Sequence, residues 1–473
     1  MEQRQLMEAL QAIVGQRFVI HDPGELRAYD CDAYTIERCL PRAVVLPAST
    51  AEVARVMRLL YNEGIPVIPR GAGTGLSGGA IPRGGEVVIG LSRMRNLVDL
   101  DLRNQRATVE AGHINLRLTQ AVQDQGYYYA PDPSSQSACT LGGNVAENSG
   151  GPHCLKYGVT TNHVLGVTLV TPDGQVLRLG GKSLDTPGYD LVGLLVGSEG
   201  TLGIVTEVTV RLLRRPQGVQ TVLALFDSVH AASAAVSAVV ARGIIPAALE
   251  MMDRMAIKAV ERGNFPVGYP EDQEAVLIIE VDGLAAGLAE QTEQILDVCR
   301  ECGCTAVRVA ASPEERKRWW DNRKTAFGAA GKLAPDYYVQ DGVIPRSRLA
   351  DVLAAINRIG ETYDIIIANV FHAGDGNLHP LICYDAKRPG EVAKVLKAGS
   401  EILAACVAAG GTISGEHGIG IEKQGDMHLV YGPDDLAAQQ QLHDVFDPAD
   451  RCNPGKMLPT PGRCTEVKRL TAS

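Results

Sequence analysis

RGAGTGLSGGA, residues 70–80, places five glycines directly after the strand-like run IPVIP at residues 65–69. Gly73, Gly75 and Gly78 satisfy the G-x-G-x-x-G pattern of Rossmann folds, but that fold requires a helix that begins at the last glycine. Here the turn-forming residues 80–85 follow instead, and no Gly-Lys-Ser/Thr completes a P-loop. The stretch is therefore a loop, and its bare backbone N–H groups are suited to cradle an anion such as a pyrophosphate.

Two further segments have the same character: PDPSSQSACTLGGNVAENSGGP at residues 131–152 and VGSEGTLGIVTEV at residues 196–208. The small residues and amides of the first would let a flat ring pack against the backbone. Glycine makes up 51 of the 473 residues, where an average usage of roughly 7% would give about 33. A tight turn explains any one of these loops, but three in one part of the chain predict a shared binding site.

The bulk properties exclude several classes of protein. The formal net charge of −10 argues against nucleic acid or an anionic membrane surface as the main partner. No apolar run is long enough to span a bilayer, and the N-terminal MEQRQLMEALQAIVGQRF lacks the apolar core of a signal peptide. We therefore expect a cytoplasmic protein with reduced thiols. Cys299, Cys302 and Cys304 lack a fourth ligand at metal-site spacing, so we expect free thiols there as well.

Hydrophobic patterning predicts an α+β protein, and a chain of this length predicts two or three domains. A helix is expected from residue 50 to Gly64, opened by a capping box of Ser49 and Glu52. Short strands and turns fill residues 86–210, and strands alternate with long helices from about 218 to 420. We expect domains at residues 1–215 and 216–420 and a C-terminal helical segment at 421–473 that returns to the first domain.

FHAGDGNLHP, residues 371–380, predicts a β-hairpin that turns at Asp375-Gly376, a dipeptide that favours a two-residue type I′ turn. Counting outward from that turn pairs His372 with His379. Directly opposite residues share one face with Cβ atoms about 4.5–5.5 Å apart, so the two imidazoles could share a metal ion. Two incidental histidines are the simpler explanation unless a third ligand is found.

GTISGEHGIGIEK, residues 411–423, supplies a candidate for that ligand. Glu416 and His417 are adjacent and point in different directions, so one can bind a metal while the other remains available as a base. Two neutral nitrogens and one carboxylate suit Zn²⁺, with Mn²⁺ or Fe²⁺ as alternatives. Asp375 is expected to form the turn rather than to act as a fourth ligand.

These loops and motifs, in this order, closely resemble the FAD-binding (PCMH-type) flavoproteins of the vanillyl-alcohol oxidase / p-cresol methylhydroxylase family, and within it the branch of glycolate oxidase flavoprotein subunits and D-lactate dehydrogenases. The resemblance implies a two-part FAD-binding domain and an α+β substrate domain, or cap. It implies that the pyrophosphate is bound by Pro69, Arg70, Gly71, Ala72, Gly73, Thr74, Gly75, Ser77, Gly78 and Gly79. Flavin and ribityl would be lined by Pro131, Thr140, Gly142, Gly143, Asn148, Ser149 and Gly150, with Gly203, Val205 and Asn453 completing the site.

The resemblance also assigns roles in the second half of the chain. It makes His372, His379 and Glu416 the metal ligands, His417 the catalytic base and Arg323 the residue that binds the substrate carboxylate. Family members that hold flavin covalently have a histidine where this chain has Thr74, so we expect non-covalent FAD. The implied activity is oxidation of a small 2-hydroxy acid, glycolate or D-lactate, to the 2-oxo acid.

Several alternatives remain open at this point. Relatives that act on D-2-hydroxyglutarate have a lysine where YYVQDGVIP has Val339 and Gln340, which disfavours a dicarboxylate here. Two histidines and a glutamate on zinc also describe a metallohydrolase, although that leaves the glycine-rich loops without a purpose. An inactive electron-relay subunit is a third possibility.

The expected partners are the hydroxy acid and an electron acceptor, which in relatives is a quinone, a cytochrome, an electron-transfer flavoprotein or an iron–sulfur partner subunit. No nucleic acid and no integral membrane segment is expected. The expected location is the cytoplasm, or the periphery of the inner membrane through a partner.

Overall fold

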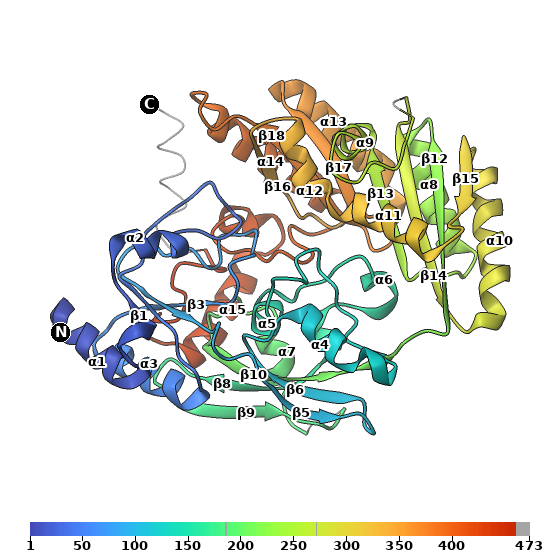
Figure 1. Cartoon of the computed structure of the whole chain (residues 1–473). Coiled ribbons are helices and arrows are strands. Elements are labelled where there is room, and N and C mark those ends of the chain that lie inside the picture. Colours follow the sequence, from blue (N-terminus) through green and yellow to red (C-terminus); the bar gives the residue numbers. More distant parts are fainter. Residues whose placement is uncertain (185–186, 271, 460–473) are drawn as a thin grey trace. The chain divides into compact units, whose positions relative to one another are not determined.

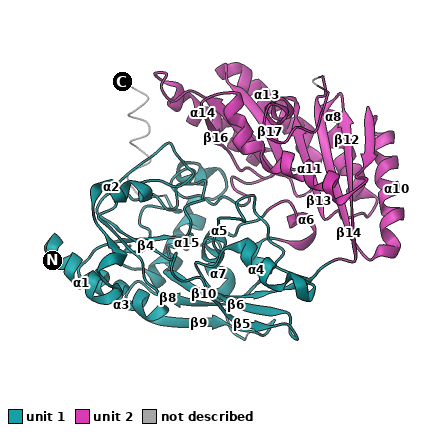
Figure 2. Ribbon diagram, viewed as in Figure 1, with its two compact units in different colours: residues 1–150, 159–215, 416–473 teal, residues 151–158, 216–415 magenta. Residues whose placement is uncertain are grey.

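The computed structural model describes residues 1–184, 187–270 and 272–459, and the chain folds into two compact units (Figures 1 and 2). Unit 1 comprises residues 1–150, 159–215 and the segment from 416 onward, and unit 2 comprises residues 151–158 and 216–415. The chain therefore leaves unit 1 twice and returns to it twice. Of the expected C-terminal segment, residues 460–473 lie outside the described residues.

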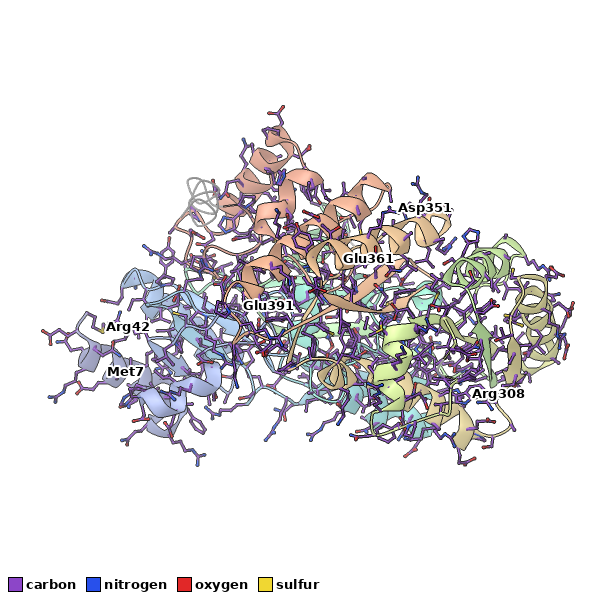
Figure 3. All side chains as sticks on the ribbon, turned by 90° about the horizontal axis from the view of Figure 1, so that it is seen from above. Met7, Arg42, Arg308, Asp351, Glu361 and Glu391 are labelled. Carbon is purple, nitrogen blue, oxygen red and sulfur yellow. The ribbon has the colours of Figure 1, made fainter. Side chains whose placement is uncertain are left out.

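The first sheet of unit 1 has four strands in the order β1 (Val19–Ile20), β2 (Ala43–Val45), β4 (Val87–Gly90), β3 (Val67–Arg70). Strands β2 and β3 run parallel to β4, and α3 (Thr50–Asn62) connects them. Helix α3 begins where expected because Ser49 Oγ accepts the N–H of Glu52 at 3.2 Å. Its apolar face and that of α1 (Gln3–Val14) bury the same core, which includes Leu10 and Met57. In the side-chain view, Met7 of α1 and Arg42, which precedes β2, lie in this part of the chain (Figure 3).

The second sheet of unit 1 is antiparallel, in the order β5 (Leu97–Asp101), β6 (Arg106–Glu110), β10 (Ile204–Arg211), β8 (Val164–Val170), β9 (Val176–Gly180). Strand β10 alternates buried and half-buried residues, as a strand with one face on the core should. That core also receives α4 (Asn115–Val122), α5 (Leu141–Glu147) and α7 (Leu191–Leu195). The remaining elements of unit 1 include α2 (Pro23–Leu26), the two-stranded sheet of β7 (Tyr127–Tyr128) and β11 (Leu213–Arg214), and α15 (Pro433–Phe446). The two larger sheets of this unit agree with the expected two-part domain.

Unit 2 is built on one antiparallel sheet of seven strands (Figure 1). Its order is β15 (Ala306–Val309), β12 (Gly218–Phe226), β14 (Ala275–Gly283), β13 (Ala248–Asp253), β17 (Ile366–His372), β18 (Asn377–Tyr384), β16 (Asp336–Val339). Strands β14, β13, β17 and β18 are almost entirely buried, so helices must cover both faces of the sheet.

Two sets of helices cover this sheet. One set consists of α8 (Val229–Ala241), α10 (Ala285–Glu301), α13 (Leu349–Tyr363) and α14 (Glu391–Ala408). The other set consists of α9 (Arg254–Glu261), α11 (Pro313–Lys324) and α12 (Ala326–Ala329), which share one apolar cluster with alternate residues of the central strands. Helix α13 carries the exposed side chains of Asp351 and Glu361 (Figure 3). The short helix α6 (Cys154–Tyr157) belongs to the inserted segment 151–158.

Two expectations about the whole chain can be compared with this fold. Cys299, Cys302 and Cys304 are free thiols. Within the described ranges, no helix is both long and apolar enough to cross a bilayer.

Candidate active site

The loop after β3 carries the first group of expected cofactor-binding residues. Gly73 and Gly78 adopt φ of +71° and +78°, a conformation that favours glycine. A Cβ at position 71 would lie 2.4 Å from Thr140 Oγ1, so glycine there allows the first loop to approach the second. Among the residues that the structure describes, the backbone N–H groups of residues 71–79 donate no hydrogen bond. A run of unused donors is the feature that an anion cradle requires.

The second loop leads into α5. Thr140 caps this helix because its Oγ1 accepts the N–H of Gly143 at 3.2 Å. A Cβ at position 142 would lie 2.7 Å from Ala111 Cβ, so this turn of helix packs directly against the end of β6. Asn148 ends the helix in the left-handed conformation, at φ +53°, and turns the chain toward Ser149 and Gly150.

Asn453 joins the C-terminal segment to two of these loops. Its side-chain amide donates to the carbonyl oxygen of Gly79 at 2.9 Å and to that of Glu199 at 2.7 Å. Its backbone N–H donates to Val67 O at 2.8 Å, at the start of β3. Gly203, at φ +141°, precedes Val205 on β10 in the third segment. Unit 1 thus contains every residue that we expected to bind FAD.

Buried charges beside these loops were not anticipated from the sequence. Glu199 holds the segment after His417, because its two carboxylate oxygens accept the N–H groups of Ile419 at 2.6 Å and Gly420 at 2.7 Å. Burial, together with the charge of Glu199, raises the pKa of Glu147 well above its usual value. The structure gives a further sign that this position is special: Glu199 adopts φ +52°, and strained non-glycine residues concentrate at functional sites.

His372 and His379 lie together in unit 2. Their ring centroids are 5.1 Å apart, the rings are perpendicular, and both side chains are buried. Glu250 on β13 is directly opposite His372, and its carboxylate oxygens lie 2.8 and 3.0 Å from His372 Nδ1. Asp341 Oδ1 lies 3.7 Å from His379 Nε2. Two imidazoles with two neighbouring carboxylates form a buried polar centre in unit 2.

The expected register of this hairpin is wrong by two residues. His379 pairs with Val370 and His372 pairs with Asn377, and residues 373–376 form a four-residue loop instead of a two-residue turn. Because Val370 and His372 are two positions apart on β17, they share a face, so the histidines still meet as diagonal neighbours. Asp375 has the expected turn-forming contact, since its Oδ1 accepts the N–H of Asn377 at 3.1 Å.

Arg323 emerges from α11 into the same centre. Its Nη2 lies 2.5 Å from Glu250 Oε2, and both side chains are at most 2% exposed. Burial alone would raise the pKa of Glu250, but the charges of His372 and Arg323 outweigh it and lower the pKa below its usual value. The sequence analysis singled out neither Glu250 nor Asp341 as a neighbour of the histidines, although Asp341 belongs to the quoted run YYVQDGVIP.

Glu416 and His417 belong to unit 1 and directly follow Gly415, the last residue of unit 2. In unit 1, Glu416 Oε2 accepts the N–H of Gly150 at 3.1 Å. In unit 2, the N–H of Gly415 donates to Asp341 O at 3.0 Å and to Asp341 Oδ2 at 3.1 Å. The chain thus passes from one expected site to the other within two residues.

Comparison with known proteins identifies the family. A family model described as "FAD linked oxidases, C-terminal domain" matches residues 215–457, and one described as "FAD binding domain" matches residues 41–180. The glycolate oxidase subunit GlcD of Escherichia coli (strain K12) is 47% identical over 448 residues, which cover 95% of this chain and 90% of that protein. The chain belongs to the FAD-linked oxidase family. The expected family and the expected cofactor FAD are therefore confirmed.

Other members of this family support the same placement. GlcD of Bacillus subtilis (strain 168) is 39% identical and covers 94% of each chain, and a D-lactate dehydrogenase of Anaerostipes hadrus is 35% identical and covers 88% of this chain and 89% of that one.

Among solved structures, p-cresol methylhydroxylase with substrate bound superposes with a TM-score of 0.78 at 16% identity, covering 96% of each chain. A 4-ethylphenol oxidase from Gulosibacter chungangensis gives a TM-score of 0.79 at 18% identity, covering 97% and 98% of the two chains. These likenesses confirm the expected fold.

The residues present fit the FAD that the family implies. The unused N–H donors of residues 71–79 are of the kind that binds a pyrophosphate, and glycine where a side chain would collide keeps the loops close together. The unit 2 centre also fits a divalent ion in its chemistry, because His372 has its Nδ1 held by a carboxylate, the usual arrangement around a metal-binding histidine.

Proposed function

We propose that this chain uses FAD to oxidise a small 2-hydroxy acid, glycolate or D-lactate, to the 2-oxo acid. The observation that carries the proposal is the buried pair of histidines joined through Glu250 to Arg323, in a member of the FAD-linked oxidase family. Relatives that match most of the chain are named glycolate oxidase subunit and D-lactate dehydrogenase, which supports this substrate class.

In this proposal each residue has a separate task. Arg323 binds the substrate carboxylate through its planar guanidinium group. His417 accepts the hydroxyl proton near neutral pH. His372, His379 and Glu416 hold a divalent ion, zinc or else manganese or iron, which when bound stabilises the developing alkoxide. FAD, bound non-covalently, supplies the hydride acceptor that no side chain can provide.

Chain connectivity supports Glu416 as the third ligand. Gly415 is hydrogen-bonded to Asp341, whose carboxylate lies 3.7 Å from His379. Since consecutive Cα atoms are about 3.8 Å apart, Glu416 begins within one residue of this centre. The side chain of the adjacent His417 points in a different direction from that of Glu416, so it can act as a base while Glu416 binds the ion.

A monocarboxylate is favoured over D-2-hydroxyglutarate. Val339 ends β16 and Gln340 follows it, and both are buried, so neither position offers a charge to a second carboxylate. Burying an unpaired carboxylate costs several kcal/mol or forces its protonation. We further infer a separate electron acceptor, because the Escherichia coli relative is named a subunit. A quinone, a cytochrome, an electron-transfer flavoprotein or an iron–sulfur subunit would fill that role, in the cytoplasm or at the periphery of the inner membrane.

The test is anaerobic reduction of the bound flavin by glycolate, D-lactate, L-lactate and D-2-hydroxyglutarate, followed as bleaching of the flavin absorption band. We expect glycolate or D-lactate to give the highest kcat/KM. A clear lead for the dicarboxylate would assign the chain to D-2-hydroxyglutarate instead. If no hydroxy acid reduces the flavin, the chain is better explained as an inactive electron-relay subunit. If the purified protein contains no flavin, the alternative of a zinc metallohydrolase is favoured.

A further inference from the structure

Glu250 occupies the centre of the unit 2 site. It stands opposite His372 across the pairing of β13 with β17, so the backbone register alone brings carboxylate and ring together. Both carboxylate oxygens lie within 3.0 Å of His372 Nδ1. An imidazole nitrogen that faces a carboxylate carries the proton, which directs metal binding to Nε2.

The same carboxylate also holds Arg323. Glu250 Oε2 lies 2.5 Å from Arg323 Nη2, so one side chain contacts two residues that belong to different parts of the proposed reaction. Within the described part of the chain, no hydrogen-bond acceptor is found for Arg323 Nε or Nη2, although both atoms are buried, so Nη2 contacts Glu250 as an ion pair. A guanidinium held by an ion pair at one nitrogen, with buried N–H donors that still lack an acceptor, is suited to receive a carboxylate ligand.

We propose that Glu250 is a positioning residue that orients both His372 for the metal and Arg323 for the substrate carboxylate. The inference rests on the proposed function, because it requires those two residues to bind metal and substrate. Its consequence is that a single change at Glu250 weakens metal binding and substrate binding together, although Glu250 touches neither ligand.

A purely structural role for Glu250 makes a different prediction. If the carboxylate only neutralises the buried charge of Arg323, then any carboxylate at position 250 suffices. Aspartate keeps the charge but withdraws the carboxylate by about 1.5 Å, one carbon–carbon bond length. Glu250→Asp therefore separates positioning from neutralisation, and Glu250→Gln removes the charge while keeping the side-chain length.

The experiment titrates the metal-free, FAD-loaded full chain with Zn²⁺ against a chelating indicator and measures KM and kcat for the preferred hydroxy acid. We expect Glu250→Asp and Glu250→Gln each to bind Zn²⁺ about 10- to 100-fold more weakly than the wild type, the usual effect of removing such a partner. We also expect KM to rise and the FAD content to stay unchanged. Glu274→Gln, the same change at a half-exposed ion pair with Arg254, is the control and should behave as wild type. His372→Ala is the reference for loss of a ligand.

The outcomes separate the inference from the proposed function. Wild-type Zn²⁺ affinity and KM in Glu250→Asp would overturn the positioning role and leave only charge neutralisation. If His372→Ala loses Zn²⁺ while both Glu250 variants keep it, the inference alone fails. If His372→Ala itself binds Zn²⁺ as wild type, the proposed metal site fails and the inference with it. Should Glu250→Gln not fold, as judged by tryptophan fluorescence, Glu250→Asp decides the question, because it leaves no uncompensated buried charge.

Discussion

At the scale of single residues, the adjacent pair Glu416 and His417 carries the sharpest expectations. Glu416 accepts one backbone hydrogen bond, from Gly150, and the residues after His417 are fixed by the carboxylate of Glu199. Contacts at Glu416 itself and directly after His417 therefore fix the backbone that carries these two side chains. A substitution at either position should change chemistry rather than fold.

The first prediction concerns Glu416→Gln. If Glu416 is a metal ligand, this variant loses bound metal and most turnover but retains FAD, because the cofactor loops lie on other segments of unit 1. The amide oxygen of glutamine can still accept the N–H of Gly150, so the local backbone stays in place. Metal content by atomic absorption and flavin content by visible absorption measure the two effects separately. Glu361→Gln, at an exposed position of α13, is the matched control, and stoichiometric metal in Glu416→Gln would remove Glu416 from the site.

The second prediction concerns His417→Ala. We expect this variant to keep both metal and flavin and to reduce its flavin about 10²- to 10⁴-fold more slowly, the usual cost of removing a general base. Rapid-mixing measurements of flavin bleaching under anaerobic conditions give the rate directly. His428→Ala, at an exposed histidine eleven residues later, serves as the control. A wild-type rate in His417→Ala would return the role of base to solvent or to another group.

At the scale of elements, the sequence predicted the hairpin and its two faces but not its turn. Period-two alternation makes the face of His372 and His379 robust to a register shift of two, which is why the histidines meet despite the wrong pairing. The turn was decided by distant contacts. Gly374 N–H donates to Leu249 O and Ile344 N–H donates to Gly376 O, so neighbouring segments hold the loop open. The preference of Asp-Gly for a tight turn is a local property, and these contacts outweigh it.

Helix α11 is held to the sheet by polar contacts with Glu280 that the sequence could not reveal. Glu280 on β14 is 2% exposed and receives Arg316 in a bidentate pair at 2.8 Å, Trp320 Nε1 at 2.8 Å and Thr221 Oγ1 at 2.8 Å. Burial raises the pKa of Glu280, but the hydrogen bonds from His153 and Arg316 and the charge of Arg316 outweigh it and lower this pKa well below its usual value. One carboxylate thus fixes the helix that carries Arg323.

The third prediction follows from that carboxylate. A group whose pKa is lower in the folded state contributes stability above its unfolded pKa, near 4.5, and this contribution is lost as the pH falls further. We expect Glu280→Gln to lower the free energy of unfolding by about 3 kcal/mol at pH 7, the low end for breaking a buried pair, because Arg316 is partly exposed. The difference from wild type should shrink as the pH is lowered from 5 to 3.

Denaturant unfolding followed by tryptophan fluorescence tests this prediction. The chain has two tryptophans, Trp319 and Trp320, and both lie on α11, so the signal reports unit 2. Glu293→Gln, at an exposed position of α10, is the control. A difference that is the same at pH 7 and pH 3 would mean that Glu280 is not ionised in the folded protein.

At the scale of the whole molecule, each unit is built from segments that are not continuous in the sequence. Segment 151–158 belongs to unit 2, where Tyr157 Oη donates to Asp282 at 2.7 Å, Lys156 pairs with the same carboxylate, and His153 contacts Glu280. No composition shift or linker marks this excursion, because polar contacts between residues more than a hundred positions apart leave no local pattern. The family resemblance, which spans nearly the whole chain, predicted the two-part domain that periodicity alone does not specify.

The last prediction belongs to this scale, because Asn453 connects the C-terminal segment to the first glycine-rich loop and to the third. Its amide satisfies the carbonyl oxygens of Gly79 and Glu199, so Asn453→Ala leaves two buried acceptors without their donor. Each unsatisfied group costs about 1–3 kcal/mol, and the loops that it joins are those expected to bind FAD. We therefore expect Asn453→Ala to bind FAD at least tenfold more weakly, measured by titrating the FAD-free protein, while the tryptophan-detected unfolding of unit 2 is unchanged. Gln440→Ala, at an exposed position of α15, controls for surface changes in the same segment. Wild-type FAD affinity in Asn453→Ala would show that the loops hold their arrangement without the C-terminal segment, and a shifted tryptophan transition would show that the damage is not confined to unit 1.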